Sequence, residues 1–187
     1  EAKERYDRAR AEGKSHDEGV LAAVRHVFCA TWNKELRRPW DSGDTYKNRY
    51  TLLRTIVWYF TEYEVDPIKT VILANGKPAV ELSFSFDTNY RTQAGEVFAL
   101  CGHIDRIGTL NNQTFPCDIK TSKYQCDSRW FAQFSPSDQF SGYDFACKVV
   151  YNLPTHGLIV DGIQVAVTLS RPARDIVHRS DAQLDEW

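Results

Sequence analysis

The stretch GHIDRIGTLNNQTFPCDIKTSK, residues 102–123, reads as two apolar strands joined by a short turn. Asn111 and Asn112 tolerate the positive φ of a two-residue type I′ turn, and such a turn pairs residues whose numbers sum to 223. Asp105 and Asp118 meet that sum, so we expect their Cβ atoms about 5 Å apart on facing strands. Like charges placed in this way repel, and either a shared proton or a cation relieves the repulsion.

A lysine and a histidine lie near the two aspartates on the expected hairpin. Lys120 follows Asp118 by two positions and is therefore diagonal to Asp105 on the same face, which His103 also shares. Carboxylate oxygens suit Mg²⁺ or Mn²⁺, and a lysine beside such a metal can orient or deprotonate an attacking water. The pattern favours phosphodiester hydrolysis. An exposed hairpin with an Asp–Lys salt bridge and no chemistry is the alternative that spacing alone leaves open.

Helices are expected in the first third of the chain. Residues 1–11 are charged and rich in Ala, and Ser15 with Glu18 forms an S-x-x-E capping box for a second helix. A third helix follows, with Asp44 as its expected N-cap. Its expected apolar face comprises Tyr46, Tyr50, Leu53, Val57 and Phe60.

Strands are expected in the part that follows. Residues 69–88 show a period of two on either side of a turn at Asn75–Gly76. The other expected elements are the hairpin strands, an amphipathic helix that begins near Pro136, and a strand within 157–169. Helices followed by antiparallel strands, a helix and a strand predict an α/β fold with a central mixed, largely antiparallel β-sheet flanked by α-helices.

Composition bounds the class of protein. The chain has 187 residues, of which 42% are hydrophobic, and this is enough for one domain with a sizeable core. A net charge of −2 does not mark a basic nucleic-acid binder, although an acidic metal site would mask a basic rim in the total. No apolar run reaches the roughly 20 residues of a membrane span, so we expect a soluble, cytoplasmic protein. The five cysteines lack paired spacing and predict reduced, mostly buried thiols.

The hairpin resembles a known nuclease family. GHIDRI followed by CDIKTSK is similar to the G-x-x-D and D-x-K-T motifs of the RecB-like branch of the PD-(D/E)XK nuclease superfamily. The residues that match are Gly102 and Asp105 in the first motif, Asp118, Lys120 and Thr121 in the second, Gln139 and Tyr143 in a following Q-x-x-x-Y motif, and Glu81 in the preceding strand. The resemblance covers roughly residues 78–168 and looks most like phage-encoded or bacterial members acting in recombination and repair.

The resemblance implies a restriction-endonuclease-like core with a Mg²⁺ or Mn²⁺ site on its strands. Asp105, Asp118 and the backbone carbonyl of Ile119 would ligate the metal, and Lys120 would position the water. Gln139 and Tyr143 would orient that lysine or contact the DNA backbone. The remaining candidate site residues are Glu81 as a catalytic residue, His103 as a metal or substrate contact, and Thr121 as a substrate contact.

The resemblance is incomplete at the N-terminus. Many members carry a metal-binding histidine on an N-terminal helix, and nothing here clearly matches it. Because the chain begins as if inside a helix, we expect a fragment whose missing N-terminus can supply that histidine. Some relatives hold an iron–sulfur cluster, but the cysteines here lack the required spacing and we expect none.

These observations predict a single nuclease domain over residues 1–187, with a helical part at about 1–65 and a catalytic core at about 70–170. The predicted activity is metal-dependent hydrolysis of DNA, by an exonuclease in recombination, repair or phage DNA processing. The alternative is a catalytically inactive nucleic-acid-binding or interaction domain on the same fold. Single- or double-stranded DNA is the expected partner and a membrane is not, while a homo-oligomer and a larger repair or recombination complex both stay open.

Two other clusters have a functional and a structural interpretation. Trp130, Phe131 and Phe134 have the character of a base-stacking surface, but we favour a packing seam. Basic residues at 34, 37 and 38 suit a phosphate-contacting patch, but we favour a solvated loop.

Overall fold

The computed structural model describes the chain except Pro136, Arg179, Asp181, Gln183 and residues 185–187. It divides into two compact units, which are described separately. The helical unit comprises residues 1–66, 121–126 and 163–173, and the sheet unit comprises residues 67–120, 127–162 and 174–187. The expected start of an amphipathic helix at Pro136 falls outside the described residues.

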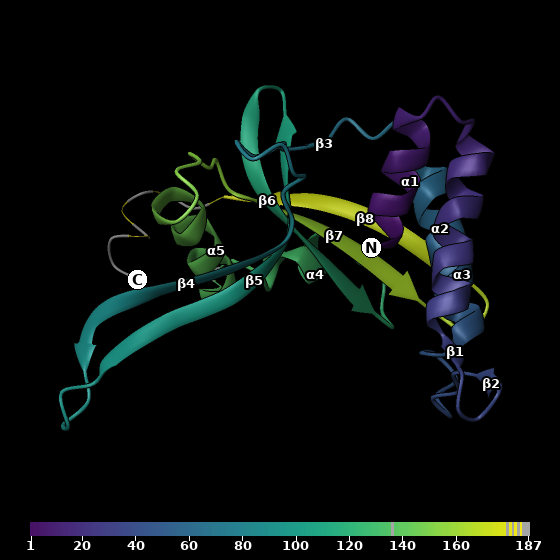
Figure 1. Cartoon of the computed structure of the whole chain (residues 1–187), viewed down its shortest axis with the longest axis horizontal. Coiled ribbons are helices and arrows are strands. Elements are labelled where there is room, and N and C mark those ends of the chain that lie inside the picture. The colour runs from purple at the N-terminus through teal and green to yellow at the C-terminus, as the bar shows by residue number, and fades with distance from the viewer. Residues whose placement is uncertain (136, 179, 181, 183, 185–187) are drawn as a thin grey trace. The chain divides into compact units, whose positions relative to one another are not determined.

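Three helices form most of the helical unit. They are α1 (Ala2–Ala11), α2 (His16–Ala30) and α3 (Arg49–Glu62), and the short strands β1 (Trp32–Asn33) and β2 (Arg38–Pro39) lie between α2 and α3. Figure 1 shows the helices side by side, and their buried side chains surround Tyr6, which stacks on Phe60 at 4.3 Å between ring centroids. The predicted capping box of Ser15 and Glu18 begins α2.

The apolar face predicted for α3 was largely wrong. The helix begins at Arg49 with Asn48 as its N-cap, whereas Asp44 accepts hydrogen bonds from two amides in the loop before it. The side chains that α3 buries are Thr51, Thr55, Tyr59 and Phe60, while Tyr50 is 85% exposed. Helical periodicity gives the spacing of a face, but the packing of α1 and α2 determines which face is covered.

Within the described residues the sheet has six strands, which run in mixed directions. They are β3 (Lys69–Thr70), β4 (Val80–Arg91), β5 (Val97–Leu110), β6 (Gln113–Ser122), β7 (Leu158–Val165) and β8 (Ser170–Val177). The order is β3-β5-β6-β7-β8, with β4 also paired to β5. Both β4 and β6 run antiparallel to β5, whereas the arrows of β6 and β7 point the same way in Figure 1. The predicted α/β class with a mixed sheet flanked by helices is confirmed.

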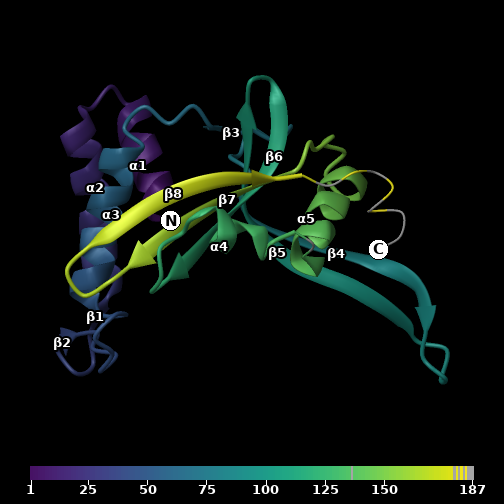
Figure 2. The same cartoon turned by 180° about the vertical axis from the view of Figure 1, so that it is seen from behind.

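Two helices connect β6 to β7. They are α4 (Ser128–Ala132) and α5 (Asp138–Val149), and α5 lies beside the hairpin of β4 and β5 in Figure 1 and in the reverse view of Figure 2. Phe86 of β4 contacts Phe145 of α5 at 5.1 Å between ring centroids, which fixes the helix against the strands. A second apolar cluster around Ile68, Phe115 and Ile159 forms the core between β3, β6 and β7.

The turn predicted from Asn111 and Asn112 is present. Their φ angles are 50° and 62°, and the paired residues include Ile107 with Pro116 and Leu110 with Gln113, so the predicted register is confirmed. Asparagine is among the few residues that reach this left-handed region at low cost, and two in succession fix the hairpin register. Among the described residues, no helix is long and apolar enough to cross a membrane.

Candidate active site

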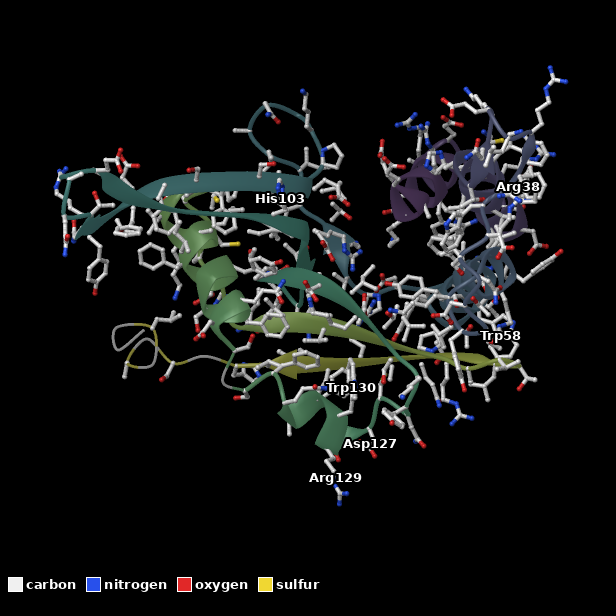
Figure 3. All side chains as sticks on the ribbon, turned by 90° about the horizontal axis from the view of Figure 1, so that it is seen from below. Arg38, Trp58, His103, Asp127, Arg129 and Trp130 are labelled. Carbon is white, nitrogen blue, oxygen red and sulfur yellow. The ribbon has the colours of Figure 1, made fainter. Side chains whose placement is uncertain are left out.

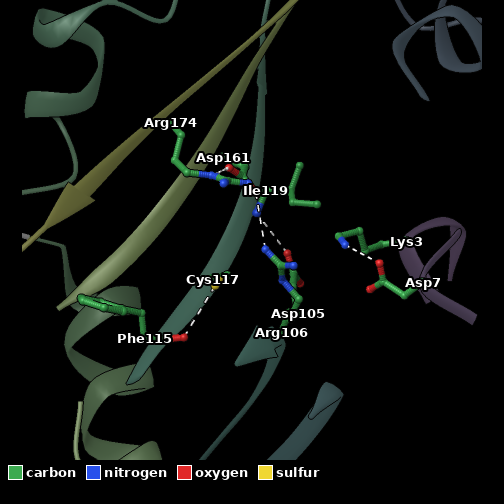
Figure 4. A network of polar contacts seen from close by, with 9 residues as sticks. All are labelled: Lys3, Asp7, Asp105, Arg106, Phe115, Cys117, Ile119, Asp161 and Arg174. Atoms are coloured by element: carbon green, nitrogen blue, oxygen red, sulfur yellow. Dashed lines mark hydrogen bonds and ion pairs between the residues drawn. The ribbon is translucent and has the colours of Figure 1, made fainter. Parts of the chain in front are cut away.

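The hairpin register brings Asp105 and Asp118 to facing positions. The regular ladder between β5 and β6 ends at Arg106 paired with Cys117, one residue before the two aspartates. There Oδ2 of Asp105 accepts a hydrogen bond of 3.2 Å from the backbone amide of Ile119, as Figure 4 shows. The Asp105 carboxylate is thus held against the strand that carries Asp118.

Asp118 is buried and its charge is only partly compensated. The residue is 2% exposed, and burial raises the pKa of its carboxyl, an effect that Lys120 opposes and Asp105 adds to. The Nζ atom of Lys120 lies 2.8 Å from Oδ2 of Asp118 as an ion pair. No donor among the described residues reaches that oxygen in good hydrogen-bond geometry. A buried carboxylate oxygen in this state is a good ligand for a cation.

Lys120 is held between the aspartate and helix α5. Its Nζ donates to Oε1 of Gln139 at 3.0 Å, and Nε2 of Gln139 donates to the Tyr143 hydroxyl at 2.7 Å. The ammonium also lies 6.0 Å from the centroid of the Phe140 ring. Residues four apart on a helix share a face, so Gln139 and Tyr143 reach the lysine from one side of α5. Burial raises the pKa of Tyr143, and the hydrogen bond from Gln139 opposes that rise.

Asp105, Gln139 and Tyr143 of the cluster line a cleft of about 580 Å³. Its lining also includes His103 and Gly102. The glycine has a packing reason, because a Cβ atom at this position would lie 2.7 Å from Cζ of Phe84. That phenylalanine meets Tyr143 edge to face at 6.4 Å between ring centroids. The small residue therefore lets β5 approach the aromatic side chains beneath the cleft.

Glu81 and His103 lie on the strands beside Asp105, and within the described residues neither forms a hydrogen bond or an ion pair with the two aspartates. The pairs on either side of Glu81, Val80 with Arg106 and Leu82 with Ile104, place it across from Asp105. Glu81 is exposed and has a φ of 51°, and a left-handed conformation within a strand is strained. Nδ1 of His103, a residue labelled in Figure 3, lies 2.9 Å from Oγ of Ser83.

Thr121 directly follows Lys120 on β6. It is grouped with the helical unit, where it lines a second cavity. Its role as a substrate contact stays a prediction.

The donor set fits a hard divalent cation. It offers the carboxylates of Asp105 and Asp118, which matches the one or two carboxylates that Mg²⁺ usually takes from a protein. No group of three His, Cys, Asp or Glu side chains in the described part of the chain is arranged to hold a metal. Water and phosphate oxygens would therefore complete the coordination, as is usual where Mg²⁺ acts on phosphates.

A buried ion network behind the site was not predicted. Asp161 of β7 is 1% exposed and accepts two hydrogen bonds from Arg174 of β8, and Nη2 of Arg106 lies 4.0 Å from its Oδ2. The network joins β5, β7 and β8 next to Asp105 (Figure 4). The only sequence signal was one aspartate within the apolar run LIVDGIQV, and its partners lie on other strands.

The aromatic cluster on α4 is a packing seam, as favoured from the sequence. Trp130 meets Phe131 and Phe134 at 4.9 and 5.0 Å between ring centroids, and Phe134 meets Phe140 at 5.3 Å. Phe131 is buried and Trp130 is half-buried, so these rings support Phe140 beneath Lys120. Figure 3 labels Trp130 on this helix.

Comparison with known proteins does not assign the chain to a family. No protein-family profile matches the chain, and no curated protein matches it. A solved structure titled "Crystal structure of SSO0001" is similar over 74% of this chain, with 13% sequence identity and a TM-score of 0.30. The chain covers 57% of that protein's length. A likeness this weak bears on neither the fold nor the function, so the candidate site rests on its own geometry.

Proposed function

We propose that the protein is a metal-dependent DNA nuclease, an exonuclease of the RecB-like type that acts in recombination, repair or phage DNA processing. The observation that supports this most strongly is the buried Asp118 carboxylate facing Asp105, with Lys120 held between Asp118 and Gln139. A cytoplasmic location and a restriction-endonuclease-like core belong to the same proposal.

Asp105, Asp118 and the carbonyl of Ile119 would hold Mg²⁺ or Mn²⁺. Bound there, the ion would supply Lewis-acid stabilisation of the charge that develops on the phosphate. The protein contributes the position of these oxygens, since the amide of Ile119 fixes Asp105 and burial fixes Asp118.

Lys120 is placed to act on the attacking water. An ammonium group has three N–H donors, of which one is bound to Gln139 and one faces Asp118. The third is free to donate to a water molecule or to a phosphate oxygen. In that position the lysine orients the nucleophile and stabilises negative charge as the P–O bond to the leaving group breaks.

Gln139 and Tyr143 set the direction of the lysine. The Gln139 side chain uses its oxygen for Lys120 and its nitrogen for Tyr143, so its orientation is determined at both ends. The Tyr143 hydroxyl accepts this bond and keeps its own proton for a further acceptor. A phosphate oxygen of the DNA backbone in the cleft is a suitable one.

The test is cleavage of end-labelled single- and double-stranded DNA with Mg²⁺, with Mn²⁺ and with EDTA. We expect metal-dependent cleavage that Lys120→Ala reduces by about 10²- to 10⁴-fold. Lys77→Ala is the matched control, because this lysine is exposed in the turn between β3 and β4 and should leave the rate unchanged. Binding of DNA without cleavage under every metal condition would contradict the proposal and favour the inactive DNA-binding alternative.

A further inference from the structure

The helical unit contains a cavity of about 470 Å³ that the proposed chemistry does not use. It is lined by Thr51, Leu52 and Thr55 of α3 and by Trp40 and Tyr46 from the loop before this helix, and these two rings are called its aromatic walls. Residues Thr121, Ser122 and Lys123 line it as well, and they belong to the same unit. A volume of this size lies within the range of small-ligand sites.

The two aromatic walls are exposed. Trp40 and Tyr46 are 42% and 44% accessible, although aromatic residues of the same chain such as Phe131 and Phe140 are almost fully buried. An aromatic pair left open around a cavity commonly marks a binding site rather than a core. Flat rings of this kind offer stacking surfaces for another flat ring.

The rim of the cavity carries more positive than negative charge. Lys47 and Lys123 line it, and neither forms an ion pair with an acidic side chain in the described part of the chain. Asp44 is the acidic lining residue, and hydrogen bonds from the amides of Tyr46 and Lys47 lower the pKa of its carboxyl. The charge of Lys47 also lowers that pKa, and the ammonium of Lys123 lies 5.0 Å from the centroid of the Tyr124 ring. The two lysines and one aspartate leave the lining with a net positive charge that suits an anion.

The loop that presents the aromatic walls is held in place before any ligand binds. The Trp40 amide donates to the Thr31 carbonyl at 2.7 Å, and the Asn48 side chain donates to the carbonyls of Asp44 and Thr45. Arg49 stacks on Phe28 with its guanidinium 3.9 Å from the ring centroid. A preformed wall costs less entropy on binding than one that must fold around the ligand.

We propose that this cavity binds one unpaired nucleotide of a DNA single strand. Its base would lie against Trp40 and Tyr46, and its phosphates would contact Lys47 and Lys123. The choice of DNA rests on the proposed nuclease function, and the cavity adds a preference for single-stranded DNA. A base within a duplex is covered on both faces by its neighbours and cannot occupy the cavity, whereas an unpaired base can.

The test measures binding in EDTA, where cleavage cannot interfere. A fluorescein-labelled strand of twelve thymidines is titrated with the full chain and followed by anisotropy. Trp40→Ala and Tyr46→Ala should each weaken binding by about 5- to 150-fold, the usual effect of removing one stacking ring. Trp58→Ala is the matched control, because Trp58 (labelled in Figure 3) is 43% exposed on α3 and does not line the cavity.

Four further variants separate stacking and charge from misfolding. Trp40→Phe keeps a ring and should restore most of the affinity that Trp40→Ala loses. Lys47→Ala and Lys123→Ala should each lower the slope of log affinity against log salt by about 0.7, whereas Lys34→Ala in the solvated loop should not.

The outcomes distinguish this inference from the nuclease proposal. If Trp40→Ala, Trp58→Ala and the wild-type protein bind the strand with equal affinity, the proposed nucleotide site is refuted. Failure of the wild-type protein to bind the strand would refute it as well. Metal-dependent cleavage would still stand in either case. Conversely, loss of binding in Trp40→Ala together with no cleavage under any metal would support the cavity and reject the nuclease.

Discussion

We predict that the buried carboxylate of Asp118 lowers the stability of the fold while it serves the proposed metal site. Burial raises its pKa, so its ionised form is less stable in the folded chain than in water. Asp118→Asn removes the charge and keeps the shape of the side chain. Lys120 loses its ion-pair partner but retains Gln139, and its side chain remains 30% exposed to water.

The magnitude follows from these two opposing effects. Removing an incompletely compensated buried charge is worth about 1–3 kcal/mol, and losing a partly exposed ion pair costs about 0–1 kcal/mol. We therefore expect Asp118→Asn to raise the free energy of unfolding by about 1 kcal/mol without metal, which is about 2–4 °C in Tm for a chain of this size. The difference should disappear as the pH falls below 3.8, the ordinary pKa of an aspartate, because the carboxyl is then neutral in both states.

Thermal unfolding in EDTA and in Mn²⁺ tests this reasoning. At about 100 times its dissociation constant, a bound ion stabilises the folded state by about 2.7 kcal/mol. The unchanged protein should gain this stability and Asp118→Asn should not, so the order of the two Tm values should reverse when Mn²⁺ is added. A variant that melts several degrees below the unchanged protein in EDTA would refute the argument. Equal stabilisation of both proteins by Mn²⁺ would place the metal elsewhere.

Three further predictions concern other parts of the sheet unit. Gln139→Leu should lower the cleavage rate by about 10- to 100-fold while leaving DNA affinity in EDTA unchanged, and an equal loss of affinity would instead assign Gln139 to substrate binding. Gly102→Ala should destabilise the fold by about 1–3 kcal/mol in denaturant unfolding, because its Cβ would lie 2.7 Å from Phe84, and Phe84→Leu should recover part of that loss. Burial raises the pKa of Cys147 from 9.0 to about 12. Above about pH 9 the unfolded chain therefore loses this thiol proton while the folded chain keeps it, so the free energy of unfolding falls as the pH rises. Cys147→Ala should make that fall shallower by about 1.4 kcal/mol per pH unit, whereas Cys29→Ala at an exposed site should not change it.

The hairpin was predictable because its determinants are local. Two asparagines set the turn, the period of two sets the faces, and both act within about ten residues of one another. The same reasoning failed for α3, where Tyr50 was expected inside and is exposed, while Thr51 and Thr55 are buried. A helix can turn any of its faces toward a neighbour, and only the neighbour decides which one is covered.

The facing positions of Asp105 and Asp118, and the place of Lys120 on their face, follow from the amino-acid sequence. The burial of Asp118 to 2% exposure, the 3.0 Å contact of Gln139 with the lysine, and the need for a small residue at Gly102 above Phe84 follow only from the packing of the folded chain. It also gathered Trp40, Tyr46 and Lys123 around one cavity. The physical reason is the range of the interactions. Strand pairing across a two-residue turn follows from backbone stereochemistry, whereas burial and cavities depend on which distant surfaces exclude water from one another.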